Sequence, residues 1–394
     1  MRIGVDATSW GNRRGYGRYT RALLTAVVEL DRANEYTFFV DREAAEFPLP
    51  AGVEVCRIST RVATTEAAGA NSHRSLSDLW AVAAAMRRAK VDLIYFPTDY
   101  TYVPLYVGVP RLVTIHDTIF AQFSNLVFPS LRSKIFYQAK IRSGIRQARL
   151  LITVSEFSRR QLVKRLRIPP SRLRVVSEAA DPTFRPMQSP RGDELMRQLG
   201  VPSGARCLVY VGGFSPHKNL SMLLGVLGDL LRRDGLADVK LLLVGDYAGD
   251  SFHSCYRELA EQVQRDKLQE HVVFTGRMKD EDLVVLLNRC QALVLPSLAE
   301  GFGLPAVEAA ACGRPVLATT ESPLPQLLGE GMLAVDPCDR VGWSNAIERV
   351  LSDGALRRRM SRAALAAASR LSWTKSARQL LSVFDEVEPH AAAA

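Results

Sequence analysis

Short apolar segments alternate with helical patterns along almost the whole chain, and this alternation constrains the fold more than any other feature. An apolar run of about four to eight residues between turn signals predicts a buried strand, and a 3.6-residue periodicity predicts an amphipathic helix. Strands that alternate with helices form parallel sheets with helices on both faces. The sequence therefore predicts an α/β fold of doubly wound parallel sheets.

The predicted strands fall into two groups. Seven lie in the first half, at residues 2–5, 36–40, 53–58, 93–96, 111–115, 150–154 and 173–176. Five lie in the second, at residues 207–211, 239–244, 272–275, 292–295 and 315–318, and helices at 340–352, 355–370 and 373–387 follow them. The segment 178–192 holds three prolines and is the predicted linker. Because 394 residues exceed one ordinary core, we expect Rossmann-like domains at 1–180 and 190–370, facing each other across a central cleft.

The six cysteines show neither CxxC spacing nor paired histidines. We therefore expect no metal site and no disulfide framework, and a reducing, cytoplasmic setting. The sequence has no apolar run of the roughly 18 residues that a membrane span needs. Its first residues read as a strand rather than a signal peptide.

The net charge of +10 comes entirely from the first half, where residues 1–178 hold 27 basic and 15 acidic side chains. No acid occurs from Thr118 to Ser155, and six bases there alternate with apolar residues. One interpretation is a solvated helix with its apolar face in the core. The other is a surface for anionic lipid headgroups or a pyrophosphate-linked acceptor, a peripheral contact at the inner membrane face. No nucleic-acid motif accompanies the charge, so we expect no nucleic-acid partner.

Residues 297–315 read SLAEGFGLPAVEAAACGRP and hold the densest group of candidate site residues. An apolar strand precedes them, Pro305 suits the first turn of a helix, and the alanines that follow favour a helix. A strand, a glycine loop and a helix start together offer N–H groups and a positive helix end to an anion. We expect Glu300 at the loop mouth and Glu308 in the first helical turn. The alternative is that Glu308 only complements the helix dipole and that Glu300 is a solvated loop residue.

The same stretch resembles the Glu-x7-Glu signature of retaining glycosyltransferases of family 4, which have the GT-B fold. The resemblance covers nearly the whole chain, is strongest over residues 207–338 and is weakest over 40–90. It implies that Glu308 binds the ribose of a nucleoside diphosphate sugar and that Glu300 contacts the donor sugar. It also implies that no metal or other cofactor is needed and that the last helix, at about 373–388, packs back on the N-terminal domain, with Trp373 at the return. The donor-loop residues are Gly301, Phe302, Gly303 and Leu304.

A second candidate is VGGFSPHKN at residues 211–219, a glycine turn between a strand and a helix. Lys218 can reach an anion as a point charge, and the alternative is a solvent lysine in a plain turn. The run resembles the donor-phosphate motif of the family, although Gly213 stands where many members have arginine. The resemblance implies a phosphate role for Lys218, and Arg277 after the strand 272–275 is a further phosphate candidate.

The loop after the first strand, GNRRGYGRY at 11–19, is not a GxGxxG motif because Thr20 stands where the third glycine belongs. It resembles the glycine-rich first loop of the family. Gly15 and Gly17 would give backbone access to the donor phosphate, and Arg13, Arg14 and Arg18 are candidate anion contacts, with Arg18 on the acceptor side. A solvent-exposed loop is the alternative.

Two further pairs lie at predicted strand ends. His116-Asp117 resembles the His-Asp of the family, which implies that His116 lies near the transferred sugar and that Asp117 orients it or an acceptor. A structural histidine is the alternative. Ser155 reads as a helix N-cap, and the resemblance places its loop on the acceptor side.

The resulting expectation is a metal-independent hexosyltransferase that moves a sugar to a glycan, lipid-linked or small-molecule hydroxyl. GDP-mannose is the first expected donor and a UDP-sugar the second. Three other functions stay open: a sugar phosphorylase, a sugar nucleotide epimerase, and a non-catalytic sugar nucleotide binder.

Overall fold

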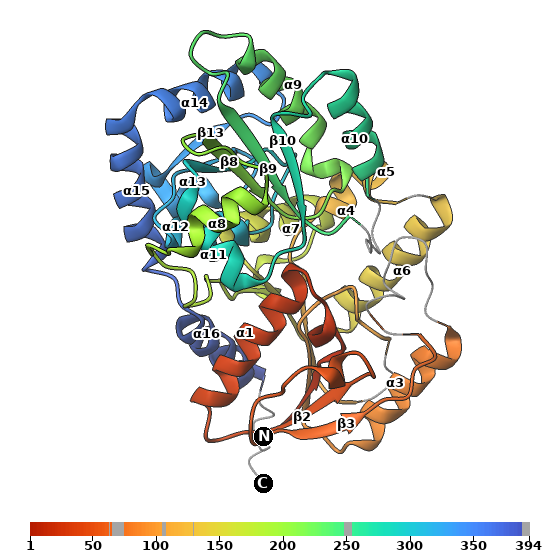
Figure 1. Cartoon of the computed structure of the whole chain (residues 1–394). Helices are drawn as coiled ribbons and strands as arrows, with labels where there is room; N and C mark the ends of the chain where they lie inside the picture. Colours follow the sequence, from red (N-terminus) through yellow and green to blue (C-terminus); the bar gives the residue numbers. More distant parts are fainter. Residues whose placement is uncertain (63, 65–74, 105–107, 129, 248–253, 388–394) are drawn as a thin grey trace. The chain divides into compact units, whose positions relative to one another are not determined.

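The computed structural model describes residues 1–62, 64, 75–104, 108–128, 130–247 and 254–387. The chain forms two compact units (Figure 1). Unit 1 comprises Met1–Glu178 together with the residues from Ser372 onwards, and unit 2 comprises Ala179–Leu371. The predicted end of the last helix at 388 lies outside the described residues. Within the described ranges no helix is both long enough and apolar enough to cross a membrane.

Unit 1 is built on a seven-stranded sheet in the order β3-β2-β1-β4-β5-β6-β7, and every neighbouring pair is parallel. The strands are β1 (Arg2–Asp6), β2 (Glu35–Val40), β3 (Glu54–Arg57), β4 (Leu93–Phe96), β5 (Arg111–Thr114), β6 (Leu150–Thr153) and β7 (Leu173–Val175). The central strands β4, β5 and β6 are fully buried and mostly apolar, as expected for parallel strands covered on both faces. All seven strands predicted in this half are confirmed.

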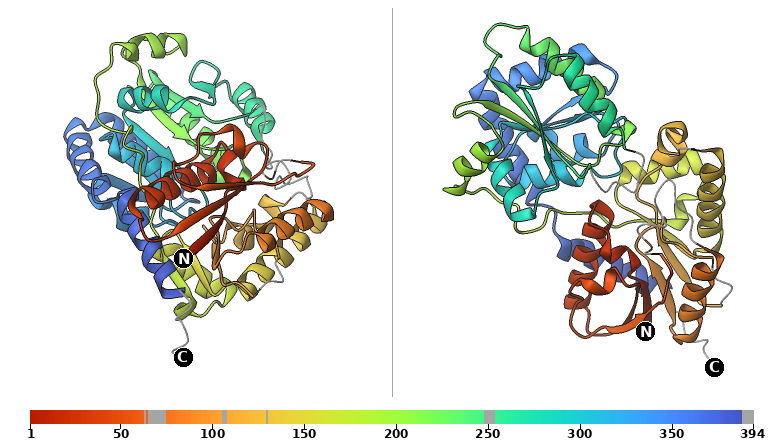
Figure 2. Two further views of the ribbon diagram at one scale, coloured as in Figure 1. Left: turned by 90° about the horizontal axis from the view of Figure 1, so that it is seen from below. Right: turned by 45° about the vertical axis from the view of Figure 1, so that its right-hand side comes forward.

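The helices of unit 1 cover the two faces of this sheet (Figure 2). They are α1 (Gly15–Leu30), α3 (Leu76–Arg88), α4 (Ile119–Gln122), α5 (Ser124–Val127), α6 (Leu131–Gln147), α7 (Glu156–Leu166) and α16 (Trp373–Val387). Alternation along β4 separates the faces. Ile94 and Phe96 belong to one core cluster with residues of α3, α6 and α7. Tyr95 points the other way, where its ring contacts Phe384 of α16.

Helix α16 packs beside α1 and is part of the core of unit 1 (Figure 2). Leu380 and Phe384 are fully buried. Trp373 is also buried, and its ring lies 6.1 Å from that of Tyr19 in an edge-on contact. At the far end of the helix, Glu386 forms an ion pair with Arg174.

Unit 2 contains a six-stranded parallel sheet in the order β10-β9-β8-β11-β12-β13. Its strands are β8 (Arg206–Val211), β9 (Val239–Val244), β10 (Val272–Gly276), β11 (Ala292–Leu295), β12 (Val316–Thr319) and β13 (Met332–Val335). Its helices are α8 (Arg191–Gln198), α9 (Leu220–Leu231), α10 (Tyr256–Arg265), α11 (Asp280–Arg289), α12 (Leu304–Ala311), α13 (Leu324–Leu328), α14 (Arg340–Ser352) and α15 (Gly354–Ala368). The five predicted strands are confirmed. The sequence analysis missed β13, a four-residue edge strand whose middle residues are not buried.

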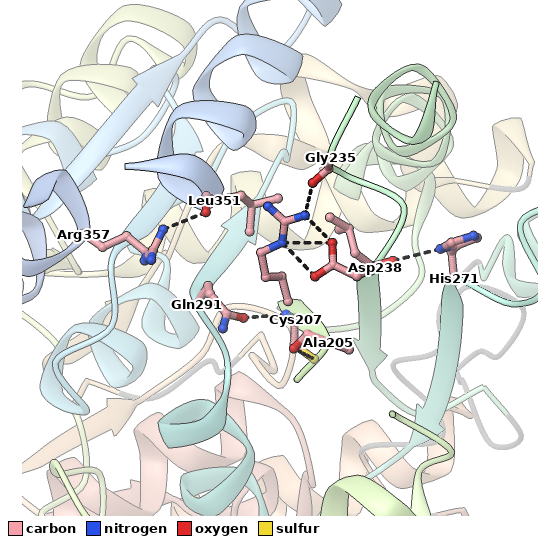
Figure 3. A network of polar contacts seen from close by, with 10 residues as sticks. Ala205, Cys207, Gly235, Asp238, His271, Gln291, Leu351 and Arg357 are labelled. Atoms are coloured by element: carbon pink, nitrogen blue, oxygen red, sulfur yellow. Dashed lines mark hydrogen bonds and ion pairs between the residues drawn. The ribbon is translucent and has the colours of Figure 1, made fainter. Parts of the chain in front are cut away.

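Polar contacts close the amino end of this sheet (Figure 3). The Arg206 guanidinium donates to the carboxylate of Asp238, just before β9. The N–H of Cys207 donates to the side chain of Gln291, just before β11. The ring Nδ1 of His271 lies 2.9 Å from the carbonyl oxygen of Val239. Protein groups therefore satisfy one another at this end, and a ligand site is expected at the opposite, carboxyl end of the strands.

The predicted linker is tied to unit 2 rather than extended. The side chain of Asn288 on α11 accepts the N–H of Met187 at 3.0 Å and donates to the carbonyl oxygen of Arg185 at 3.0 Å. The linker was expected to begin at Glu178, but that residue is buried in unit 1, three residues beyond the end of β7.

Candidate active site

In unit 2, β8 and β11 are neighbours in the middle of the sheet, and the loops that follow them diverge. The chain leaves β8 toward β9 on one side and leaves β11 toward β12 on the other. Open α/β sheets bind ligands at such a point, outside the carboxyl ends of the strands. The two loops, residues 212–219 and 296–303, hold five of the eight donor-binding residues predicted in unit 2: Gly213, Lys218, Gly301, Phe302 and Gly303.

Asn219 joins these loops. Its backbone is left-handed (φ 59°, ψ 30°), which asparagine tolerates better than most residues, and this bend leads from the turn Pro216–Lys218 into α9. Its side-chain Nδ2 donates to the carbonyl oxygens of Pro296 at 3.2 Å and Pro337 at 2.8 Å. One amide therefore links the loops after β8, β11 and β13.

Lys218 and Glu300 meet at the junction of the two loops. The Lys218 Nζ donates to Glu300 Oε1 at 2.7 Å, and both side chains are largely buried. The hydroxyl of Ser297, itself fully buried, donates to the same Oε1 at 2.6 Å. Because both bonds converge on Oε1, the second oxygen, Oε2, is the one that can accept a hydrogen bond from a ligand hydroxyl. Sequence reasoning named Lys218 and Glu300 separately and missed both their pairing and Ser297.

Helix α12 begins directly after the glycine loop. Gly303 is left-handed (φ 86°, ψ 47°) and has no side chain to cap the helix. Pro305 has no N–H, and the N–H of Ala306 donates to the carbonyl oxygen of Gly303 at 2.9 Å, so Leu304 is the first-turn residue whose N–H can serve a ligand at the loop. A Cβ on Gly303 would lie 2.9 Å from a methyl carbon of Leu324, so any other residue would have to displace that side chain as well as adopt a strained backbone. Gly301, Phe302 and Leu304 are buried around this turn.

Glu308 lies deeper in α12 than predicted. The helix starts at Leu304 and its first turn holds no acid, so Glu308 falls in the second turn rather than the first. Only 1% of Glu308 is exposed. The interpretation of Glu300 as a solvated loop residue is also wrong, because Glu300 is 9% exposed and ion-paired.

The remaining predicted residues of unit 2 lie around this centre. Gly213 follows β8, and its carbonyl oxygen accepts the Tyr210 hydroxyl at 2.6 Å. Arg277 is exposed beyond β10, two strands away from β8. His217, beside Lys218, is partly buried. Burial and the charge of Lys218 lower the pKa of His217 to about 3, so this imidazole is neutral.

In unit 1 the glycine-rich loop lies between the end of β1 and the first turn of α1. Helix α1 starts at Gly15, and a Cβ on Gly17 would lie 1.7 Å from the carbonyl oxygen of Asn12, so position 17 requires glycine. Gly15 has open space around its Cα. The side chain of Asn12 accepts the N–H of Arg14 at 2.8 Å, which fixes the loop. Arg18 lies in the first turn of α1 and is partly buried.

His116 lies just beyond β5 and is buried between two acceptors. Its Nε2 lies 3.1 Å from the carbonyl oxygen of Pro97, and its Nδ1 lies 3.4 Å from Glu178 Oε1. Burial alone would lower the pKa of His116, but the hydrogen bond and the charge of Glu178 outweigh it, so the pKa is raised. The imidazolium form can donate from both nitrogens at once.

Aromatic rings and a second carboxylate surround this histidine. The rings of Tyr16 and Tyr19 meet the imidazole edge-on, with centroids at 5.0 and 4.5 Å. Asp99 is buried nearby and accepts the hydroxyl of Tyr137 at 2.7 Å. Burial first, then the charge of Asp99, raises the pKa of Tyr137 well above its usual range. The sequence analysis missed Asp99, whose one available signal was its place just after the strand 93–96.

Asp117 and Ser155 make local contacts. The carboxylate of Asp117 accepts the N–H of Ile119 at 2.8 Å, and the carboxylate that pairs with His116 belongs to Glu178 instead. Ser155 is the N-cap of α7 and accepts the N–H of Ser158 at 3.0 Å, which confirms the predicted cap.

Two family models match the chain. Residues 13–184 match the model described as Glycosyltransferase Family 4, and residues 192–367 match the model described as Glycosyl transferases group 1. Together they span most of both units.

Relatives with assigned functions are similar to parts of the chain. A D-inositol 3-phosphate glycosyltransferase of Corynebacterium efficiens is 34% identical over 221 residues, 55% of this chain and 51% of the relative. The O-antigen chain mannosyltransferase B of Escherichia coli is 27% identical over 289 residues, 73% of this chain and 74% of the relative. The chain thus matches only about half the length of the first of these relatives.

Solved structures share the fold over nearly the full length. The sucrose-phosphate synthase of Thermosynechococcus elongatus superposes with a TM-score of 0.73 at 20% identity, covering 98% of both chains. Anabaena HepE in complex with UDP-glucose superposes with a TM-score of 0.72 at 20% identity, covering 98% of this chain and 99% of HepE.

Proposed function

Because the chain belongs to glycosyltransferase family 4 and has the GT-B fold, we propose that it transfers a sugar from a nucleoside diphosphate sugar to an acceptor hydroxyl with retained α configuration. One observation carries the proposal. At the switch point of the sheet in unit 2, Lys218, Glu300 and the start of α12 lie together, with buried Glu308 one turn further on. Cation, helix end and carboxylates suit a ligand that combines a diphosphate with many hydroxyls.

The donor diphosphate is assigned to Lys218 and the first turn of α12. As the glycosidic bond breaks, the leaving diphosphate gains negative charge. A fixed ammonium and the N–H of Leu304 at the helix start stabilise that charge without reorganising. That HepE binds UDP-glucose supports a nucleotide sugar as the donor. Glu308 would then accept the ribose hydroxyls, with Gly213 and Arg277 as further donor contacts.

Glu300 is assigned to the donor sugar. Its Oε1 takes hydrogen bonds from Lys218 and Ser297, which orient the carboxylate and lower its nucleophilicity. We therefore propose that Glu300 binds sugar hydroxyls through Oε2 rather than forming a covalent intermediate. The acceptor hydroxyl would attack from the face that the diphosphate leaves, which retains the configuration.

The acceptor is assigned to the loops at the carboxyl end of the sheet in unit 1. Both ring nitrogens of His116 face protein acceptors, so we propose that it acts as a positioning residue that holds the rings of Tyr16 and Tyr19. Asp117, Arg18 and Ser155 are proposed on the acceptor side, and Gly15 and Gly17 beside the donor phosphate.

GDP-mannose is the first proposed donor, and the E. coli mannosyltransferase relative supports mannose. A UDP-sugar is the second. The acceptor is proposed to be a glycan, a lipid-linked glycan or a small molecule. The Corynebacterium efficiens relative makes D-inositol 3-phosphate a compound to test.

The first experiment is a thermal-shift screen of GDP, UDP, ADP and dTDP, since a ligand that binds the folded state raises Tm by mass action. Lys218→Ala should abolish most of the shift, because it removes the cation proposed to bind the diphosphate. Asp234→Ala, on the surface of unit 2, is the control. No shift with any of the four nucleotides would refute the donor site.

The second experiment measures release of nucleoside diphosphate from the donor with and without an acceptor pool. Release that depends on the acceptor supports transfer. Release of sugar 1-phosphate from a glycan with inorganic phosphate would show a phosphorylase, and interconversion of the nucleotide sugar alone would show an epimerase. Binding without turnover in any pool would show a non-catalytic binder. Transfer that persists with EDTA would support the proposed metal independence.

A further inference from the structure

Helix α6 exposes apolar side chains on its outer face. Leu131, Ile135 and Phe136 are 71%, 57% and 60% exposed. Globular proteins usually turn such side chains inward, and three on one face of one helix mark an interaction surface. The inner face of α6 is occupied as expected, since Ile141 is buried in the core cluster of unit 1.

The same outer face carries arginines. Residues 131, 132, 135, 136, 139, 142 and 146 are all exposed, and their spacing of three or four residues places them along one stripe of the helix. We call this set the α6 stripe. Its first half is apolar apart from Arg132, and its second half carries Arg142 and Arg146. No acid occurs on α6 or anywhere from Thr118 to Ser155, so nothing in this sequence segment neutralises the stripe.

A second helix on the same face adds to the patch. Helices α3 and α6 both contribute to the core cluster on one side of the sheet. On α3, Trp80 is 73% exposed, and Arg87 and Arg88 are exposed at the end of the helix. Tryptophan is enriched where a protein meets the membrane–water interface.

We propose that the α6 stripe, together with Trp80, docks on an anionic lipid surface. A helix of this kind lies in the membrane interface rather than crossing the bilayer. Its apolar side chains insert partly, and its arginines contact the phosphates of the headgroups. Charge complementarity favours a lipid surface as the partner, because the basic, acid-free face matches a negatively charged leaflet. An acidic protein surface would match the arginines but would not bury Leu131, Ile135 and Phe136. The inference is independent of the proposed reaction.

The test is co-sedimentation of the full chain with vesicles of phosphatidylglycerol and phosphatidylcholine in equal parts, and with vesicles of phosphatidylcholine alone. We expect binding to the anionic vesicles only, weakened as salt is raised. The triple change Arg132→Gln, Arg142→Gln and Arg146→Gln should lower the partition coefficient roughly 100-fold, since each base near such a surface contributes about five-fold. Leu131→Ser with Ile135→Ser should lower it about tenfold or more.

The control removes the same charge from unit 2. Arg358, Arg359 and Arg362 are exposed on α15 near the partly exposed Leu365, and changing all three arginines to glutamine should leave binding unchanged. Because all the altered side chains are exposed, each variant should keep the circular dichroism and Tm of the unaltered chain. Equal binding to neutral vesicles, full binding by the α6 variants, or equal loss in the α15 control would each overturn the proposal. So would a concentration-dependent dimer in light scattering that Ile135→Ser abolishes, because a second copy would then cover the stripe.

Discussion

Gly303→Ala tests the geometry at the start of α12 most directly. Gly303 has φ 86°, where an alanine costs roughly 1–2 kcal/mol. Its added methyl would lie 2.9 Å from Leu324 Cδ1, and because Leu324 is fully buried its side chain can shift only against packed neighbours. Forcing a methyl into such a site costs about 1–3 kcal/mol. The total loss of unfolding free energy is therefore roughly 2–5 kcal/mol.

Gly204→Ala is the matched control. Gly204 lies in the same unit with φ 82°, and no atom of the described residues lies within 4 Å of the position that its Cβ would take, so only the backbone cost applies. In a domain of this size each kcal/mol moves Tm by about 2–4 °C. Scanning calorimetry should then place the transition of the Gly303 variant roughly 2–12 °C below that of the Gly204 variant.

Nucleotide binding separates the two variants further. Titration calorimetry with GDP, or with whichever nucleotide the screen selects, should show binding lost in Gly303→Ala and kept in Gly204→Ala. If both variants melt together and bind nucleotide alike, the close contact with Leu324 does not shape the site, and the reasoning fails.

Three further predictions follow from the same structure. Glu308→Gln should weaken nucleotide affinity by roughly tenfold to a hundredfold, as loss of charged hydrogen bonds does, and unchanged titration calorimetry would count against a ribose role. Ser297→Ala should lower kcat about tenfold with little change in KM, because Glu300 loses a positioning bond on Oε1; a variant with normal kcat would remove Ser297 from the mechanism. Glu178→Gln should change how stability depends on pH. Because the pKa of His116 is raised in the folded state, the ion pair adds stability that is complete below the pKa of the unfolded histidine, about 6.5, and is lost as pH rises through the folded pKa. Urea unfolding should therefore show a fall in stability above pH 6.5 that is smaller in this variant, and an identical slope would disprove the pairing.

The strands were predictable because burial on both faces of a parallel sheet requires continuous apolar runs, and such runs are visible in a single sequence. Strand β13 was missed although its four residues, MLAV, form an apolar run as long as those of β4 and β11, so its signal was present in the sequence. Glu178 was misplaced for a different reason. Three prolines follow Glu178 in the chain and suggested a linker, whereas His116, with which it forms an ion pair, is 62 positions away.

In the candidate site, too, single residues could be predicted from the sequence but their contacts could not. Lys218 and Glu300 each belong to a local pattern, but their contact joins residues 82 positions apart and depends on β8 and β11 being neighbours. Glu308 was predicted one turn too early because the helix begins at Leu304, before the proline that suggested its start. Local chemistry is thus readable from the sequence, and the pairing of distant groups requires the sheet order.

The return of α16 to unit 1 has a consequence for biosynthesis. Unit 2 is one uninterrupted stretch of chain, whereas unit 1 needs Leu380 and Phe384 from its last segment to complete its core. During translation, unit 2 therefore has all its residues available while unit 1 still lacks a helix, although domains that emerge first generally fold first. A nascent chain halted at residue 371 should present an apolar groove along α1 to chaperones and proteases, and a separately expressed first half should aggregate unless α16 is supplied as a peptide.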